Sequence, residues 1–182
     1  SSQYGGQSIS LTHLAPFVDV SRQKIRKDVE VEIALTGATP SEKTISDIVE
    51  KRLKSEIEKG CQMIQYQVVT LMTTNGQSPF VTIFMHLKDD DEYVEENAMI
   101  VEEILRQRYE GIKNEMGVYI TPAFPKLVYV LDEHNCLKGG KYDYITKLAV
   151  KCSSKRLYPD YISAKKMREN YENNVFSPMG CR

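Results

Sequence analysis

The stretch that most constrains the fold is "TPSEKTISDIVEKRLKSEIEKGCQMIQYQVVTL", which begins at Thr39. Ser41 is a suitable N-cap before an acidic first turn, and the pattern predicts one long helix over about residues 41–72. Gly60, inside the pattern, weakens this prediction. Thirty helical residues would reach about 45 Å, and a helix of that length packs against another helix, in the same chain or in a dimer. Its apolar stripe consists of Ile45, Ile48, Val49, Leu53, Ile57, Cys61, Ile64, Val68 and Leu71.

Helical and strand patterns alternate along the rest of the chain, which is typical of an α/β fold. A helix is expected from Leu11 to Leu35, ended by Gly37, and another from the acidic "KDDDEYVEEN" to near Gly117. Strands are expected in "PFVTIFMHL" and at Lys126 to Leu131, and two further helices in "YDYITKLAVKCSSKRL" and after Pro159. Residues 1–10 read as a loop. Two strands are too few for an independent sheet, so the remaining strands are expected in other parts of a longer polypeptide.

Composition excludes several classes of protein. The 182 residues carry a formal net charge of −1, which argues against non-specific binding to nucleic acid. No apolar run approaches the roughly 18 residues that a membrane helix needs, and the stretch "SSQYGGQSIS" has neither the basic nor the apolar region of a signal peptide. The four cysteines, at positions 61, 136, 152 and 181, form no CxxC pair, so reduced thiols in the cytoplasm are expected, with no metal site. Cys61 and Cys152 occupy apolar helix positions and are expected in the core.

Two stretches are candidate functional sites. Cys181 follows Pro178, Met179 and Gly180, a sequence suited to a tight loop tip that presents a thiol as nucleophile, redox centre or hydrogen-atom carrier. The alternative is that this cysteine is an accident of where the chain was cut. In "NGQSPF", the amides of Asn75 and Gln77 could hold a polar substrate at a barrel mouth, although Asn-Gly is also an ordinary turn between a helix and a strand.

Three other patterns are more simply explained as structural. "GGQS" at Gly5 to Ser8 lacks the spacing of a Walker A loop or of a dinucleotide fingerprint. "DDDE" at Asp89 to Glu92 does not match an EF-hand loop and suits the positive end of a helix dipole. His134 and Cys136, two positions apart, are only weak evidence for a metal.

Five stretches in order resemble the anaerobic (class III) ribonucleoside-triphosphate reductase family: "SSQYGGQSIS", "TTNGQSPFVTIFM", "TPAFPKLVYVLDEHN", "GGKYDYITKLAVKCSSKRLYPDYISAKKMRENY" and "NVFSPMGCR". The resemblance covers nearly all of residues 1–182. It implies that the chain is a single segment of a ten-stranded α/β barrel of the glycyl-radical type. It also implies that residues of about 173–182 form the finger loop, whose Cys181 becomes a thiyl radical and abstracts the 3′ hydrogen of a ribonucleotide.

The resemblance further implies several cofactors and partners. In the family the radical is stored on a glycine near the C-terminus and generated by an iron–sulfur activase that uses S-adenosylmethionine; formate is the expected reductant, and a zinc site lies in the C-terminal region. ATP and dNTP effectors regulate reduction of ribonucleoside triphosphates in a homodimer, whose helical interface would include the helix at 41–72. The regulatory N-terminal domain and the glycyl radical and zinc region are not in this sequence. The chain, which starts with Ser and ends in a long loop, is therefore expected to be an internal piece and inactive in isolation.

Two alternatives remain open. A non-catalytic helical dimerisation or nucleotide-regulatory module would make Cys181 incidental. A glycyl-radical enzyme for another substrate, such as an acyl or diol lyase, would keep the cysteine and change the chemistry. The position of Cys181, inside a barrel of strands or on a tail, would separate the first alternative from the reductase.

Overall fold

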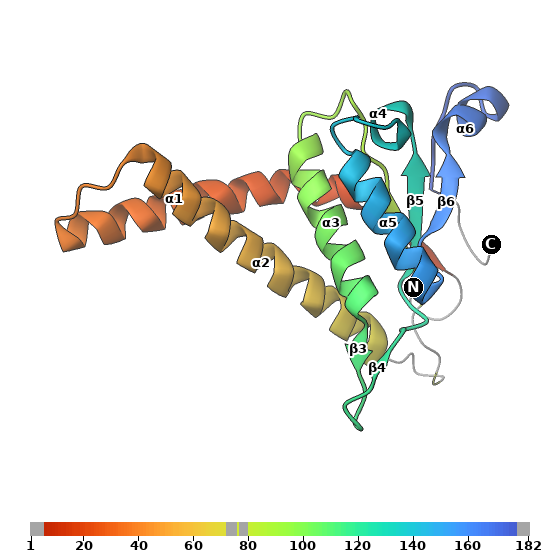
Figure 1. The fold of residues 1–182 in the computed structure, drawn as a ribbon, viewed down its shortest axis with the longest axis horizontal. Coiled ribbons are helices and arrows are strands. Elements are labelled where there is room, and N and C mark those ends of the chain that lie inside the picture. Colours follow the sequence, from red (N-terminus) through yellow and green to blue (C-terminus); the bar gives the residue numbers. More distant parts are fainter. Residues whose placement is uncertain (1–5, 72–75, 77–79, 178–182) are drawn as a thin grey trace.

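The computed structural model describes residues 6–71, 76 and 80–177. Its centre is a four-stranded parallel sheet in the order β1 (Gln7–Ser10), β2 (Val81–Met85), β5 (Lys126–Leu131) and β6 (Asp160–Ser163). A separate antiparallel pair consists of β3 (Ile112–Lys113) and β4 (Tyr119–Ile120). Helices connect the parallel strands, as a parallel sheet requires (Figure 1). They are η1 (Leu11–His13), α1 (Ala15–Thr36), α2 (Glu42–Thr70), α3 (Val94–Glu110), α4 (Glu133–Cys136), α5 (Asp143–Arg156) and α6 (Ala164–Asn170).

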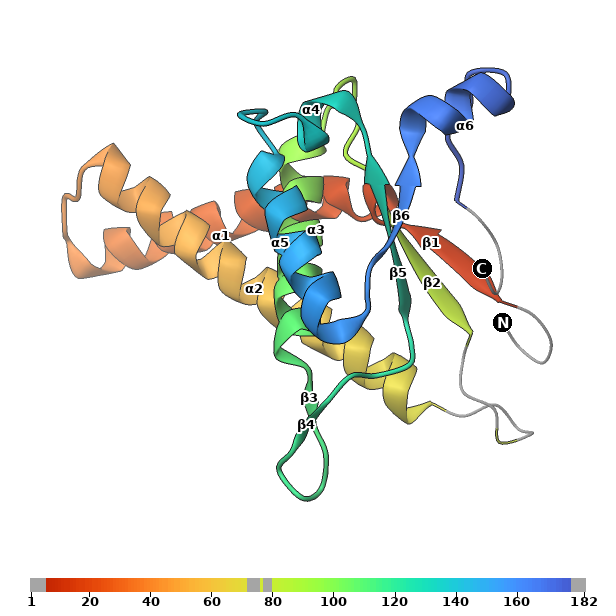
Figure 2. The ribbon, with the colours of Figure 1, turned by 45° about the vertical axis from the view of Figure 1, so that its right-hand side comes forward.

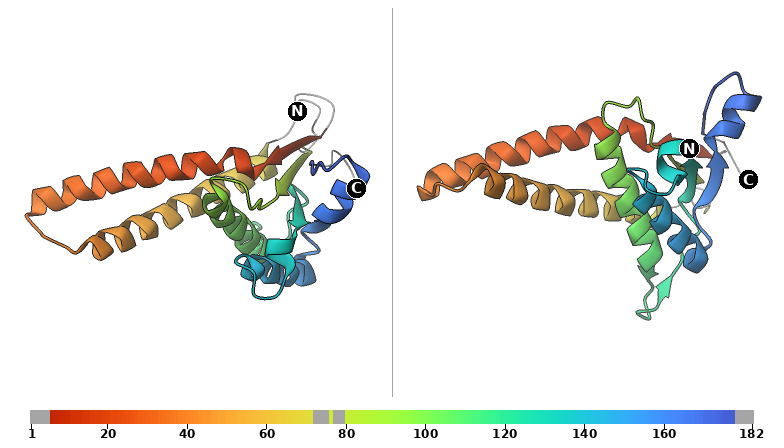
Figure 3. Two further views of the ribbon diagram at one scale, coloured as in Figure 1. Left: turned by 90° about the horizontal axis from the view of Figure 1, so that it is seen from above. Right: turned by 45° about the horizontal axis from the view of Figure 1, so that its top comes forward.

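The predicted long helix is confirmed as α2, an unbroken helix of 29 residues. The Ser41 side chain caps it by accepting a hydrogen bond from the backbone N–H of Thr44. Gly60 lies within the helix without interrupting it. The partner that its apolar stripe requires is α1, which ends at Gly37 in the left-handed conformation (φ 68°). The two helices form a hairpin whose tip projects away from the rest of the molecule (Figure 3).

The two faces of the sheet have different coverings, because alternate residues of a strand point to opposite faces. Helices α3 and α5 pack against one face, together with the base of the α1–α2 hairpin, at the end opposite its tip (Figure 2). From the strands, this main core receives Ile83, Met85, Leu127 and Tyr129. Cys61 also lies in it, as predicted, and Cys152 is fully buried on α5.

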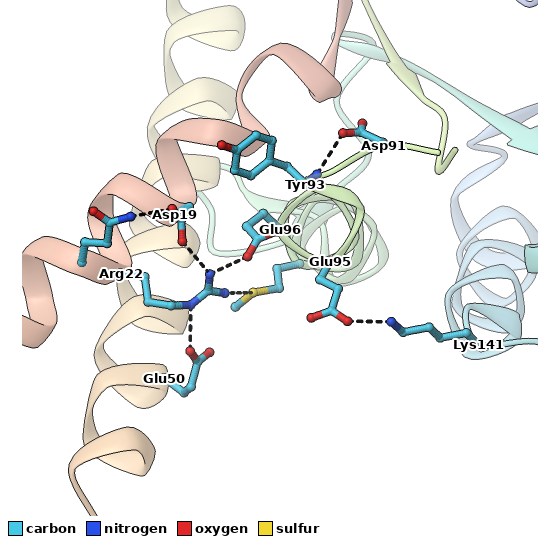
Figure 4. A network of polar contacts seen from close by, with 10 residues as sticks. Asp19, Arg22, Glu50, Asp91, Tyr93, Glu95, Glu96 and Lys141 are labelled. Carbon is cyan, nitrogen blue, oxygen red and sulfur yellow. Dashed lines mark hydrogen bonds and ion pairs between the residues drawn. The ribbon is translucent and has the colours of Figure 1, made fainter. Parts of the chain in front are cut away.

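Arg22 attaches the hairpin to the body of the molecule (Figure 4). Its guanidinium, on α1, contacts the carboxylates of Asp19 on the same helix, Glu50 on α2 and Glu96 on α3, and the sulfur of Met99. The Nε–Oε1 distance to Glu50 is 2.9 Å. One cation therefore joins three helices. Burial opposes a raised pKa of Arg22, but the hydrogen bonds that its guanidinium donates to Glu96 and Glu50 outweigh burial and raise this pKa.

Several expectations about the elements were wrong. The stretch at residues 1–10 is not only a loop, and residues 160–163 are not only a turn before a helix: they contribute the strands β1 and β6. The sheet is therefore larger than the two strands expected. The helix that begins at Val94 ends at Gly111 rather than near Gly117, because Gly111 adopts φ 87° and ψ −177°, which no helix continues. Ile112 accordingly lies in β3. The chain after β5 also contains the short helix α4.

Candidate functional site

The candidate site is the sheet face opposite α3 and α5, together with the carboxyl ends of β2 and β5. Phe84, Val128 and Val130 point to this second face and are buried. Over the described residues, they are covered by the C-terminal part of the chain, through Ala164 on α6 and Val175 beyond it. A parallel sheet is normally covered on both faces, and in the described residues this second face carries only a small apolar cluster.

Polar residues accompany the apolar ones on the second face. Ser8, Thr82 and Lys126 are register partners across three neighbouring strands and so share a face. The next row on the same face contains Ser10 on β1 and Asp160 on β6. A face that mixes hydroxyl, ammonium and carboxylate groups with apolar side chains suits a polar ligand better than a continuous hydrophobic core does.

An ion pair between a buried carboxylate and a partly exposed guanidinium lies at the carboxyl end of the sheet. Asp132, directly after β5, receives two hydrogen bonds from the guanidinium of Arg168 on α6, with N–O distances of 3.0 and 2.6 Å. His86, directly after β2, lies with its Nε2 3.2 Å from Asp132 Oδ2. Both Asp132 and His86 are buried, with 7% and 2% of their surface exposed. This arrangement links β2, β5 and α6 at one point.

The local backbone holds Asp132 in place. Its Oδ1 accepts a hydrogen bond from the backbone N–H of Glu133, and the side chain of Asn135 accepts one from the backbone N–H of Asp132, which makes a capping box at the start of α4. The amide of Asn135 also donates to the carbonyl of Val130, and that of Asn97, on α3, donates to the carbonyl of His86. The carboxylate therefore lies in a largely buried frame of backbone hydrogen bonds.

Charge states follow from these contacts. Burial by itself would raise the pKa of Asp132, but hydrogen bonds from Arg168, His86 and the backbone N–H of Glu133 lower it to about 2. The pKa of His86 is lowered, because burial outweighs the stabilising effect of Asp132 on the imidazolium. Asp132 is ionised and can only accept, so neutral His86 carries its hydrogen on Nε2. This leaves His86 Nδ1 as a buried acceptor without a protein partner in the described part of the chain.

The residues predicted from the sequence as the site lie outside the described residues. This applies to Cys181, Pro178, Met179 and Gly180, and to Asn75 and Gln77. Between the two amides, Gly76 is described and has a left-handed φ of 73°, as expected of an Asn-Gly turn.

Sequence reasoning missed the cluster of His86, Asp132 and Arg168 and treated His86 as an isolated histidine. A usable signal existed, because His86 and Asp132 each directly follow a strand, and the carboxyl ends of parallel strands share one edge of a sheet. Asp89 pairs with His134 at 3.2 Å, and within residues 6–71, 76 and 80–177 no group of three or more His, Cys, Asp or Glu residues could hold a metal ion. In the same residues, no helix is long and apolar enough to cross a membrane.

Comparison with known proteins identifies the family. The family model described as "Anaerobic ribonucleoside-triphosphate reductase" matches residues 1–182. The chain belongs to this family. Proteins named anaerobic ribonucleoside-triphosphate reductase are similar to it: that of Enterobacteria phage T4 is 37% identical over 187 aligned positions, which cover 100% of this chain and 28% of the phage protein. Those of Escherichia coli and Haemophilus influenzae are 37% and 35% identical, over 98% of this chain and 23% and 24% of their own lengths. The chain thus spans about a quarter of the length of these relatives.

Proposed function

We propose that this chain is a segment of the catalytic subunit of an anaerobic ribonucleoside-triphosphate reductase, and that Cys181 is its hydrogen-abstracting residue. The observation that carries the proposal is that the family match extends over the whole chain, including the C-terminal stretch that ends in Pro178, Met179, Gly180 and Cys181. The described residues before this stretch support it, because Val175 packs on the second face of the parallel sheet rather than extending away from it. In a ten-stranded barrel, this second face would be the interior.

The proposed chemistry suits a thiol. A thiyl radical on Cys181 takes the hydrogen atom from C3′ of the ribose, so that an S–H bond forms, the C3′–H bond breaks and the unpaired electron moves to the sugar. The hydrogen atom can return to the sugar at the end of the cycle, because S–H and activated C–H bonds are similar in strength. Formate is the proposed reductant: with one proton it converts the 2′ C–OH into C–H, and carbon dioxide and water are released.

The other components belong to the same proposal. A glycine in another part of the subunit would store the radical, an S-adenosylmethionine-dependent activase would generate it, and ATP or dNTP would regulate substrate choice. Substrate contacts by Asn75 and Gln77, a zinc site elsewhere in the subunit and a cytoplasmic location complete it. The described residues of this chain would provide four of the ten barrel strands, and its C-terminal stretch would provide the loop that carries the thiol.

The test uses the full-length reductase with Cys181 replaced by Ser. After anaerobic activation, the glycyl radical signal and deoxyribonucleotide formation are followed together. We expect the radical signal at the wild-type level and no product. Product formation by the variant would refute the role of Cys181.

One observation also favours a role for the helical hairpin in dimer formation. Four large apolar side chains of α1 are exposed, namely Phe17, Val20, Val31 and Leu35. At about 100° per residue they lie within about 60° of one another on the side of α1 turned away from its packed residues Val18, Ile25 and Val29. We propose that this α1 stripe packs against the same stripe of a second copy.

The oligomeric state tests this proposal. Leu35→Glu should shift the reductase from dimer to monomer in sedimentation velocity, because it places a charge in an apolar contact. Val150→Glu is the matched control, since Val150 is an exposed apolar residue on α5, outside the stripe. An unchanged dimer in the Leu35 variant, or equal dissociation in both, would contradict the assignment of the stripe.

A further inference from the structure

We propose that Arg168 is a positioning residue for the hydrogen-abstracting thiol: it fixes α6 and the turn after it to the carboxyl end of β5, and so sets where the segment that leads to Cys181 begins. This inference rests on the proposed function, in which Cys181 carries the radical. Arg168 itself contacts no reacting group in this assignment and acts through the chain that follows it.

The first step of the argument is that α6 needs an external anchor. It contains seven residues, too few for an isolated helix to be stable in water. Only Ala164 and Met167 among its residues are buried. The ion pair of Arg168 with Asp132 supplies a third attachment, and its two parallel hydrogen bonds fix the orientation of the helix as well as its distance from the sheet.

The second step is that Arg168 also holds the turn that follows. Its carbonyl oxygen accepts a hydrogen bond from the backbone N–H of Asn173 at 2.9 Å. Glu172 and Asn173 adopt φ values of 51° and 65°, in the left-handed region that residues with a side chain rarely occupy. Two such residues in succession persist only where the surroundings determine the turn. Arg168 therefore connects the rigid end of β5, through its side chain, to this turn, through its backbone.

The third step is the direction in which the chain leaves the turn. Asn174 donates its backbone N–H to the carbonyl of Tyr171 at 2.9 Å, and the ring of Phe176 lies 5.0 Å from that of Tyr171. Between them, Val175 packs on the second face of the sheet, with Phe84, Val128 and Val130. A rotation or shift of α6 would move this contact, and with it the end of the described chain at Ser177, from which the sequence continues to Cys181.

The fixed place of Asp132 explains why the start of the segment that leads to Cys181 would be held reproducibly. Asp132 is buried in the capping box and contacts His86, so its carboxylate does not follow α6 when the helix moves. A hydrogen-atom transfer requires sulfur and carbon in near contact, and a misplacement of about 1 Å can reduce a rate about 100-fold. Loss of this anchor should therefore reduce turnover more than substrate binding.

The experiment compares Arg168→Gln with Lys166→Gln in the full-length reductase. Both changes remove one positive charge from α6, but Lys166 is exposed and its ammonium pairs with Glu169 of the same helix, at 2.6 Å. We expect R168Q to lower kcat at least tenfold, with KM within threefold of the wild type and the glycyl radical signal unchanged. K166Q should behave as the wild type. Arg168→Lys should give an intermediate kcat, because an ammonium cannot engage both carboxylate oxygens as a guanidinium does.

A second measurement does not depend on activity. The rate at which iodoacetamide alkylates Cys181 is determined by peptide mass spectrometry in the same variants, and the buried thiols of Cys61 and Cys152 report whether the fold is intact. We expect the rate at Cys181 to change at least threefold in R168Q and to stay unchanged in K166Q, with Cys61 and Cys152 protected in both. If Cys61 and Cys152 become alkylated in R168Q, the fold of that variant is lost, and the threefold change in the alkylation rate at Cys181 is then required of R168K instead.

The outcomes separate this inference from the proposed function. An unchanged alkylation rate at Cys181 together with unchanged kcat in a folded Arg168 variant would overturn the positioning role, as would an equal effect of K166Q. Product formation by the Cys181→Ser variant would instead refute the proposed function, while the alkylation comparison would still decide whether Arg168 positions the segment.

Discussion

The buried carboxylate of Asp132 makes a quantitative prediction about stability. Its pKa is about 2 in the folded protein, against an ordinary 3.8. Each unit of pKa difference corresponds to about 1.36 kcal/mol, so ionised Asp132 should contribute about 2 kcal/mol to the free energy of unfolding. The Asp132 side chain is only 8% exposed, whereas that of Arg168 is 39% exposed, so solvent screening removes part of this contribution but not all of it. The perturbation is Asp132→Asn, which keeps the shape and removes the charge.

The sign of the pH dependence follows from the direction of the shift. Because the pKa is depressed by folding, the contribution is fully present above pH 4 and is lost as the pH falls towards 2. The assay is urea unfolding of the wild-type and variant chains, followed by circular dichroism from pH 7 to pH 3. The variant should be less stable by up to about 2 kcal/mol at pH 7, and the part of this difference due to charge should be about half as large near pH 3.

A matched control tests whether the charge of Asp132 is what stabilises the fold. Glu169→Gln removes a carboxylate that is also paired, with Lys166, but exposed to solvent, and it should leave the pH dependence unchanged. If the difference between the wild type and Asp132→Asn is the same at pH 7 and pH 3, the charge of Asp132 is not what stabilises this end of the sheet, and the reasoning is refuted.

Three further predictions concern other parts of the chain. Gly111→Ala should destabilise the chain by about 1–3 kcal/mol, because Gly111 has φ 87° and the added Cβ would lie 2.7 Å from the carbonyl oxygen of Ile120. Gly60→Ala lies in open space within α2 and should stabilise the chain by about 0.5–1 kcal/mol. Thermal unfolding of the two variants tests this difference. Arg22→Gln should lower the free energy of unfolding by about 2 kcal/mol and speed amide hydrogen exchange in α1. Arg26→Gln should have little effect, because the ion pairs of Arg26 are exposed. Equal effects of the two changes would contradict the role of Arg22 as the attachment of the hairpin. The isolated chain should form no deoxyribonucleotide in an anaerobic assay with activase, substrate and formate, and any turnover would show that an incomplete barrel suffices.

The accuracy of the sequence-based predictions depended on how local the signals were. The cap at Ser41 and the apolar stripe are contained in α2 itself, and the run at Lys126–Leu131 predicted β5 to the residue. By contrast, β1 and β6 have only four residues each, of mixed polarity, and exist because they pair with β2 and β5. No pattern within "QSIS" or "DYIS" distinguishes a strand from a loop.

The same reason explains the outcome for the candidate site. Cys181 was named through a motif and a family resemblance, and it stays a prediction. The anchor of His86, Asp132 and Arg168 joins residues 46 and 36 positions apart, which become neighbours only when β2, β5 and α6 are assembled. The strand pattern predicts only that His86 and Asp132 lie at one edge of the sheet, and propensity and periodicity do not predict that Arg168 joins them there.

The α1–α2 hairpin has a consequence for the order of folding. The connection from β2 to β5 and that from β5 to β6 are compact, whereas β1 pairs with β2 across the whole hairpin, with Gln7 beside Val81. Contacts between residues far apart along the chain form late, because the intervening loop must close first. We therefore expect β2, β5 and β6 to assemble with α3 and α5 as a folding nucleus. We expect β1 to pair with β2 last, after α1 and α2 have packed against each other from the tip of the hairpin inwards. The projecting hairpin would then contribute to folding as well as to contact with a second copy, because it brings the distant strand β1 to the edge of a sheet that has already formed.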